Sequence, residues 1–104
     1  MLPEKPTLLE IQKHLADECA AKGWDKNSIT EVFLLLTEEV GELAKAVRKE
    51  TAFKGEKKPE SKDHLVEEIA DVFNYLLEIA NRFDVDLESA YRQKHSINQT
   101  RTWN

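Results

Sequence analysis

The chain has 104 residues, of which 20 are acidic and 15 are basic, giving a net charge of −5 at pH 7. Residues 1–89 contain all 20 acidic and 12 of the basic residues, a net charge of −8, whereas residues 90–104 carry +3. A body this acidic repels long phosphate backbones, so we expect no nucleic-acid polymer as a partner.

Hydrophobic residues make up 40% and charged residues 34% of the chain, with three glycines and three prolines, which is typical of an ordered helical domain. We therefore predict a single domain over residues 1–104. A core of this size is modest, so self-association is expected. Cys19 is the sole cysteine, which favours a reducing cytoplasm. Because we find no membrane-length apolar run and no signal-peptide pattern, we expect a cytoplasmic protein without a membrane partner.

Thr7 and Ser28, each followed three residues later by glutamate, predict capping boxes at the starts of two helices. The first helix is predicted to run to about Lys22, where Gly23 ends it, and the second to about Ala52.

A polar loop is predicted over residues 53–62, followed by a third helix over 63–82 and, with Asp86 as N-cap, a fourth over 87–97. Apolar residues repeat at steps of four and three along the two long helices, as expected of helices packed in a bundle. These seams are Ile29, Phe33, Leu36, Val40, Leu43 and Val47, and then Leu65, Ile69, Val72, Leu76, Ile79 and Phe83. The predicted fold is all-α: a four-helix bundle with short connections, assembled as a dimer or tetramer.

Two acidic pairs border these seams. Glu39 with Glu42, and Glu68 with Asp71, are each three residues apart, so both carboxylates of a pair share one helix face. Such pairs are also common on solvated faces, but if the two helices are neighbours, four carboxylates converge and repel one another. Oxygen ligands without histidine or cysteine favour a hard cation such as Mg²⁺ or Mn²⁺. The pattern therefore predicts a metal site at these four residues. Glu38, in contrast, falls roughly 140–160° from its seam and is expected to face water.

These motifs resemble those of the MazG-like nucleoside triphosphate pyrophosphohydrolases. The resemblance rests on E-E-x-x-E at residues 38–42, on E-x-x-D at residues 68–71, and on a tail that reads K-x-x-x-N-x-x-R-x-W. The flanking phrases EVGELAKA and EEIADVFNYLLEIA agree with it, and it extends from about Trp24 to Trp103.

The resemblance implies an all-α homodimer or homotetramer that binds Mg²⁺. It also implies hydrolysis of nucleoside triphosphates between the α and β phosphates, which gives the monophosphate and pyrophosphate. Such an activity suits house-cleaning of the nucleotide pool.

The resemblance also implies roles for particular residues. The four paired acids would be the metal ligands. Glu38, which matches the acid that orients or deprotonates the attacking water, and Glu39 are the implied catalytic residues. Trp24 and Tyr75 match positions that line the base pocket in related dCTP-cleaving members. The implied phosphate contacts are Lys94, Asn98 and Arg101.

Two alternatives to this function remain open. Within the same fold, a phosphoribosyl-ATP pyrophosphohydrolase uses similar acidic pairs. A non-catalytic helical module that dimerises through its seams and senses nucleotides is the alternative from a different class.

Overall fold

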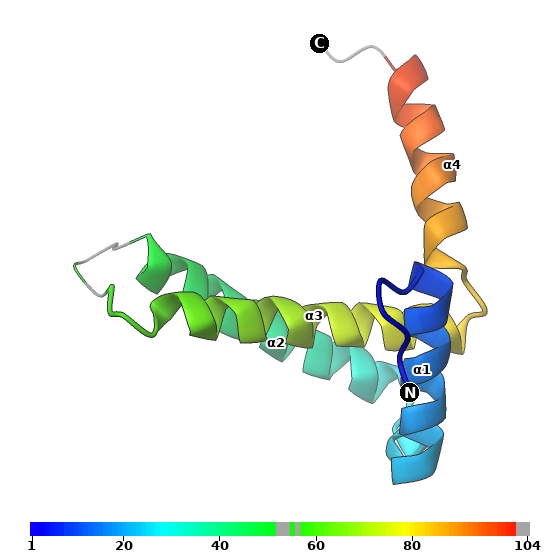
Figure 1. Cartoon of the computed structure of the whole chain (residues 1–104), viewed down its shortest axis with the longest axis horizontal. Helices are drawn as coiled ribbons and strands as arrows, with labels where there is room; N and C mark the ends of the chain where they lie inside the picture. The colour runs from blue at the N-terminus through cyan, green and yellow to red at the C-terminus, as the bar shows by residue number, and fades with distance from the viewer. Residues whose placement is uncertain (52–54, 56, 102–104) are drawn as a thin grey trace.

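A computed structural model of the chain describes residues 1–51, 55 and 57–101. These residues form α1 (Leu8–Lys22), the 3-10 helix η1 (Trp24–Lys26), α2 (Ile29–Glu50), α3 (Ser61–Arg82) and α4 (Leu87–Thr100), as Figure 1 shows. The all-α class and the four α-helices are confirmed, and the described residues contain no β-strand. The predicted helix end at Ala52, the loop residues Phe53, Lys54 and Glu56, and Trp103 of the tail motif lie outside the described residues.

The predicted helix signals are confirmed by hydrogen bonds. Thr7 and Ser28 each accept a hydrogen bond from the backbone N–H three residues on, and each donates its own N–H to the glutamate there. Asp86 caps α4 in the same way, by accepting a hydrogen bond from the N–H of Ser89. Gly23 ends α1 in a left-handed conformation, with φ of 74°, which glycine adopts without steric cost.

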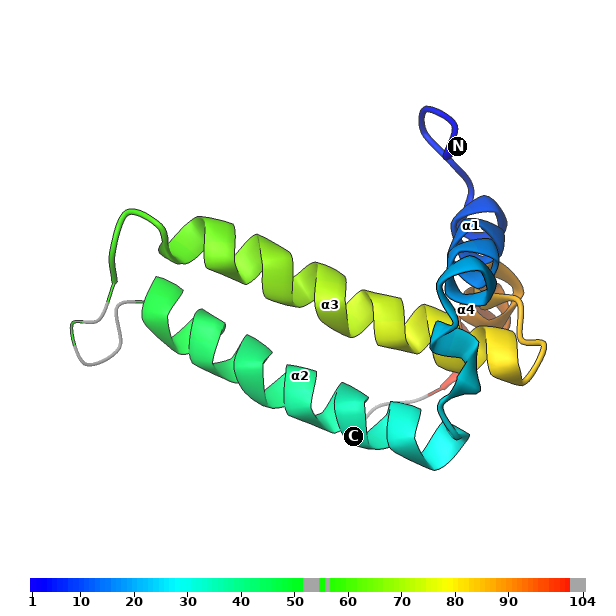
Figure 2. The same ribbon diagram turned by 90° about the horizontal axis from the view of Figure 1, so that it is seen from below.

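The helices are arranged as a long antiparallel hairpin with two helices across its end. α2 and α3 lie side by side and make most of the contacts between elements, while α1 packs against α3 (Figures 1 and 2). α4 starts at the same end of the hairpin and contacts α1. The radius of gyration is 16.5 Å, whereas a compact domain of this length has about 13 Å. A single chain is therefore an open structure.

A glutamine fixes the corner between α3 and α4. Gln12 of α1 is only 4% exposed, and its amide donates hydrogen bonds to Asn81 Oδ1 (3.2 Å) and to the carbonyl of Val85 (2.8 Å). Its Oε1 accepts the N–H of Leu87 at 2.9 Å, and Asn81 donates back to the Gln12 carbonyl at 2.9 Å. Because every polar group of this side chain is paired, the network ties α1 to the end of α3 and to the start of α4.

The sequence predicted that every residue of the α2 seam is buried. In a single chain, every second residue of this seam is instead exposed, so the prediction is wrong at those positions. Phe33, Val40 and Val47 are 60%, 47% and 44% exposed. The reason is that α3 packs against the adjacent face of α2, so the buried residues there are Val32, Leu36 and Ala46.

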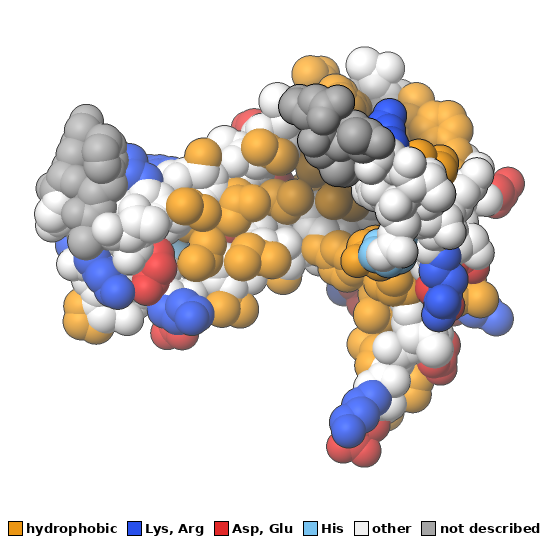
Figure 3. Space-filling model, turned by 90° about the horizontal axis from the view of Figure 1, so that it is seen from above, with side chains coloured by type: hydrophobic (Ala, Val, Ile, Leu, Met, Phe, Trp, Pro, Cys, Tyr) orange, Lys and Arg blue, Asp and Glu red, His pale blue; other side chains and the backbone are white. Residues whose placement is uncertain are grey.

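Exposed apolar residues continue along the hairpin on α3. Figure 3 shows hydrophobic side chains gathered over the hairpin. We define the apolar hairpin surface as the exposed residues Phe33, Val40 and Val47 of α2, with Val66, Ile69, Phe73 and Leu76 of α3 and Phe83 directly after it. None of the described helices is long and apolar enough to cross a membrane.

Candidate active site

The pairing of α2 with α3 brings three of the four predicted metal ligands together. One carboxylate oxygen from each of Glu39, Glu68 and Asp71 lies within 4.8 Å of the other two. Glu39 and Glu68 are half-buried, and Asp71 is exposed. Glu42 is exposed and lies outside this group, although its charge is close enough to act on Glu39. We call Glu39, Glu68 and Asp71 the acidic cluster.

The electrostatics of the acidic cluster are unfavourable without a cation. Burial raises the pKa of Glu39, and a hydrogen bond with Glu68 and the negative charges of Asp71, Glu68 and Glu42 raise it further. Glu68 Oε2 is buried and has no hydrogen-bond partner within the described part of the chain. A buried acceptor without a donor is costly, and a hard divalent cation would satisfy it while offsetting the repulsion. The donor set therefore fits a divalent metal.

Glu38 is exposed, as its position on the helix predicts. Its charge is still close enough to contribute to the raised pKa of Tyr75, after burial of the phenol and the charges of Glu39, Glu78 and Asp71. Glu38 therefore lies near the acidic cluster without belonging to it.

A cavity of about 410 Å³ opens beside the acidic cluster, where α1 and η1 cover the α2–α3 hairpin. Its lining residues are Leu15, Glu18, Cys19, Trp24, Asn27, Leu35, Glu39, Asp71, Asn74, Tyr75 and Glu78. Two members of the acidic cluster thus share a cavity with both aromatic residues predicted to contact a base.

The two aromatic residues offer different surfaces. Trp24 is 48% exposed, and the ammonium of Lys22 lies 4.6 Å from the centre of its ring, so a cation already covers one face. Tyr75 is half-buried, and its raised pKa keeps the phenol protonated at neutral pH, so its hydroxyl can donate a hydrogen bond.

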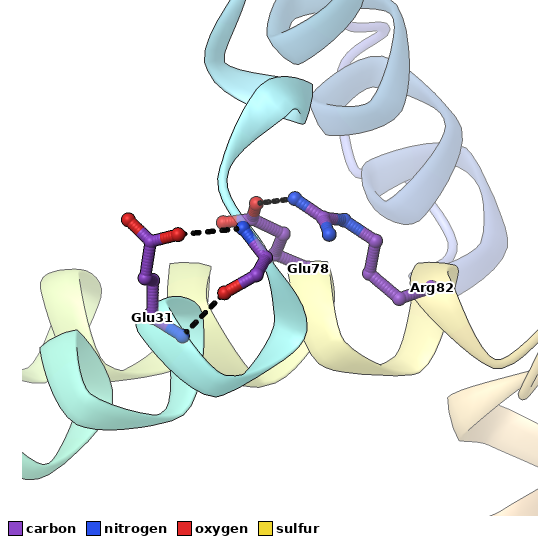
Figure 4. Close-up of polar contacts among 4 residues, drawn as sticks. Glu31, Glu78 and Arg82 are labelled. Atoms are coloured by element: carbon purple, nitrogen blue, oxygen red, sulfur yellow. Dashed lines mark hydrogen bonds and ion pairs between the residues drawn. The ribbon is translucent and has the colours of Figure 1, made fainter.

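Several polar lining residues were not predicted from the sequence. Asn74 and Glu78 follow Asp71 by three and seven residues, so extending the same helix face by two turns would have found them. Glu78 forms an ion pair with Arg82, one turn further on, at 3.1 Å (Figure 4). Asn27 directly follows η1, and Glu18 lies on α1. No local sequence pattern shows that these two elements pack against the hairpin.

The predicted phosphate-contacting residues are placed elsewhere in the chain. Lys94 and Asn98 lie on α4 and Arg101 caps its end, all three exposed. Among the described residues, α4 contributes none to the cavity beside the acidic cluster. A single chain does not bring these residues together with the acids.

Comparison with known proteins identifies similar sequences. Residues 27–101 match the MazG nucleotide pyrophosphohydrolase domain. The chain is 35% identical over 101 residues to dCTP pyrophosphatase 1 of Rattus norvegicus, and 35% identical over 103 residues to that of Homo sapiens. Each match covers 93% of this chain, which spans 59% of the length of these relatives. It is also 42% identical over 64 residues to the uncharacterized protein YpjD of Bacillus subtilis, covering 61% of this chain and 58% of that protein.

Proposed function

The chain belongs to the MazG nucleotide pyrophosphohydrolase family, and on that premise we propose that it hydrolyses nucleoside triphosphates to the monophosphate and pyrophosphate. The observation that carries the proposal is the convergence of Glu39, Glu68 and Asp71 at the edge of a cavity that also holds two aromatic residues. Hydrolysis of a phosphoanhydride needs neutralised phosphates and a positioned water more than it needs a covalent intermediate. A carboxylate cluster that holds a divalent cation beside a nucleoside-sized cavity would meet both needs.

The metal we propose is Mg²⁺, with Mn²⁺ as a substitute. Glu39, Glu68 and Asp71 would hold it, with Glu42 as the fourth carboxylate. When bound, such a cation neutralises phosphate oxygens and lowers the pKa of bound water. Support for this assignment comes from the all-oxygen donor set and from the unpartnered Oε2 of Glu68.

The remaining roles follow from position. Glu38 and Glu39 are the proposed catalytic pair: Glu39 in the acidic cluster and Glu38 on the solvent side, where it can orient an incoming water or accept its proton. Trp24 and Tyr75 are proposed to contact the base, because both line the cavity. Base stacking on an aromatic face contributes about 1–3 kcal/mol in other proteins.

We also propose that the chain functions as a homodimer or homotetramer. The open shape and the apolar hairpin surface support this, because monomers rarely expose so many large apolar residues on one element pair. In such an assembly Lys94, Asn98 and Arg101 are proposed to contact phosphates, since α4 extends away from the cavity of its own chain (Figure 1).

Product analysis tests the function directly. A panel of ribo- and deoxynucleoside triphosphates, with dCTP and phosphoribosyl-ATP included, is incubated with the protein and Mg²⁺. We expect equal amounts of monophosphate and pyrophosphate from at least one nucleoside triphosphate. Release of orthophosphate, cleavage of phosphoribosyl-ATP alone, or binding without turnover would each contradict the proposal.

Two neighbouring glutamates provide a matched pair of variants. Glu68→Gln removes a member of the acidic cluster and is expected to lower kcat/KM at least about 100-fold, because even residues that only support metal ligands contribute 10- to 100-fold. Glu67→Gln makes the same chemical change on the exposed side of α3 and should leave kcat/KM unchanged. Equal losses in both variants would show that the effect does not come from the acidic cluster.

A further inference from the structure

The cavity beside the acidic cluster contains a carboxylate that the proposed chemistry does not use. Glu78 lines this cavity on α3, and its side chain is 15% exposed. Burial is the main cause that raises the pKa of the Cys19 thiol and of the Tyr75 phenol, and the charge of Glu78 raises both further. The Glu78 carboxylate therefore lies among the side chains that form the cavity wall.

Arg82 holds this carboxylate in place. Its Nη2 donates to Glu78 Oε1 at 3.1 Å, and both side chains are largely shielded from water, 24% and 15% exposed. A carboxylate accepts hydrogen bonds at both oxygens, so one contact with arginine leaves capacity for a ligand donor. The ion pair thus orients the carboxylate without filling all of its acceptor sites (Figure 4).

The distance between Glu78 and the acidic cluster along α3 is comparable to the length of a nucleoside. Glu78 follows Asp71 by seven residues on the same face of α3, which is about 10 Å along the helix axis. A sugar and a pyrimidine base span a comparable length, and Tyr75 lies between these two levels. If the phosphates bind at the acidic cluster, Glu78 would lie at the edge of the base opposite the sugar.

We propose that Glu78 is a specificity-determining residue that selects bases carrying an amino group at the edge opposite the sugar, as in cytosine, over bases carrying a keto oxygen there, as in uracil and thymine. The proposal rests on the proposed function, because it assumes that the phosphates bind at the acidic cluster.

The chemistry of the two bases explains the selection. The 4-amino group of cytosine donates to a carboxylate, and a hydrogen bond to a charged group is stronger than a neutral one. The 4-keto oxygen of uracil is an acceptor, so it meets the same carboxylate without a hydrogen bond and with electrostatic repulsion. When uracil binds, the partly desolvated carboxylate of Glu78 is left without a hydrogen-bond donor from the base. This costs more free energy than it would at a carboxylate open to water, so the preference for cytosine is stronger.

The other carboxylate in the cavity wall that lies outside the acidic cluster is less suited to this role. Glu18 on α1 is paired with Lys22 at 3.8 Å and lies 3.7 Å from His14, and its side chain is 38% exposed. It is therefore more solvated than Glu78, and its contribution to base selection is expected to be smaller.

Binding of isosteric nucleotides tests the role of Glu78 separately from turnover. Calorimetry with Mg²⁺ and the α,β-imido analogues of dCTP and dUTP gives the ratio of their dissociation constants. In the wild type we expect the cytosine analogue to bind at least about tenfold more tightly, the effect of a single hydrogen bond to a charged group. In Glu78→Gln the ratio should fall to about threefold or less, because an amide can either accept or donate.

Glu88→Gln is the matched control, since Glu88 also pairs with an arginine four residues later, Arg92, at 3.0 Å, but stands on α4 outside the cavity. This variant should keep the wild-type ratio. A ratio near one in the wild type, or an unchanged ratio in Glu78→Gln with its melting temperature preserved, would overturn the assignment of Glu78. Absence of turnover in the product analysis, with the binding ratio as expected, would instead overturn the proposed function and leave the base selection supported.

Discussion

At the scale of single residues, the site depends on acids that would be unfavourable as neighbours unless something neutralised them. Glu39 has a raised pKa because it is half-buried and next to Glu68 and Asp71. Its environment therefore penalises the ionised form in the metal-free protein. If Glu39 binds a cation as proposed, its ionised form lowers the stability of the folded protein when the cation is absent.

This cost can be measured with Glu39→Gln. In EDTA we expect the variant to have a higher melting temperature than the wild type, because the amide removes one of the like charges that crowd the acidic cluster. Millimolar Mg²⁺ should then raise the melting temperature of the wild type and leave that of the variant unchanged, because ligand binding stabilises only a folded state that has the site. Thermal denaturation followed by circular dichroism gives both values. An equal response of both proteins to Mg²⁺ would show that Glu39 is not a ligand.

At the scale of elements, the capping boxes determine the residues at which α1 and α2 begin. The hydrogen bonds of Gln12 determine the direction of α4 relative to the hairpin. The buried side chain of Gln12 donates hydrogen bonds to Asn81 of α3 and to the carbonyl of Val85 in the connection, and it accepts one from the N–H of Leu87 of α4. The angle of α4 against the hairpin, and with it the direction of Lys94 and Asn98, depends on this network.

Replacement of Gln12 by leucine should therefore destabilise the fold by about 2 kcal/mol or more, because the carbonyl of Val85 and the N–H of Leu87 lose their partners in a site of low exposure. Urea unfolding measures this loss. Lys13→Leu is the control, since Lys13 is the exposed neighbour on the same helix, and it should change the free energy of unfolding by less than about 0.5 kcal/mol. A small effect for Gln12→Leu would mean that the network does not determine the corner.

At the scale of the whole molecule, the open shape and the apolar hairpin surface support the proposal that the chain self-associates. Stable interfaces bury roughly 1,600 Å² and concentrate apolar residues at their centre. Ile69, between Val66 and Phe73 in the apolar hairpin surface, is 52% exposed in the single chain.

Sedimentation of the purified protein should give a mass of at least twice the 12.0 kDa of one chain. Ile69→Asp places a charge in the apolar hairpin surface, and we expect it to shift the protein to the monomer mass. His64→Asp adds the same side chain at an exposed position on the opposite side of α3 and should leave the mass unchanged. A monomeric wild type, or an assembly indifferent to Ile69→Asp, would contradict the proposed oligomer.

Much of the fold was predictable because its signals are local. The capping boxes at Thr7 and Ser28, the N-cap Asp86 and the helix end at Gly23 depend on residues within one turn of one another. The seams were only partly predictable. Periodicity shows that α2 has an apolar face, but it does not show whether α3 or a second chain covers Phe33 and Val40.

The sequence by itself determined the four helices and the acidic pairs, because spacing along a helix decides which side chains share a face. Only the tertiary structure decided that Glu39, Glu68 and Asp71 meet while Glu42 stays outside, since that depends on the register between α2 and α3. It also decided that α1 and η1 close a cavity over Tyr75 and Glu78. The physical reason is that the register and the crossing angle of two helices depend on packing between segments far apart in the sequence. The hydrophobic periodicity of one segment alone does not contain this information.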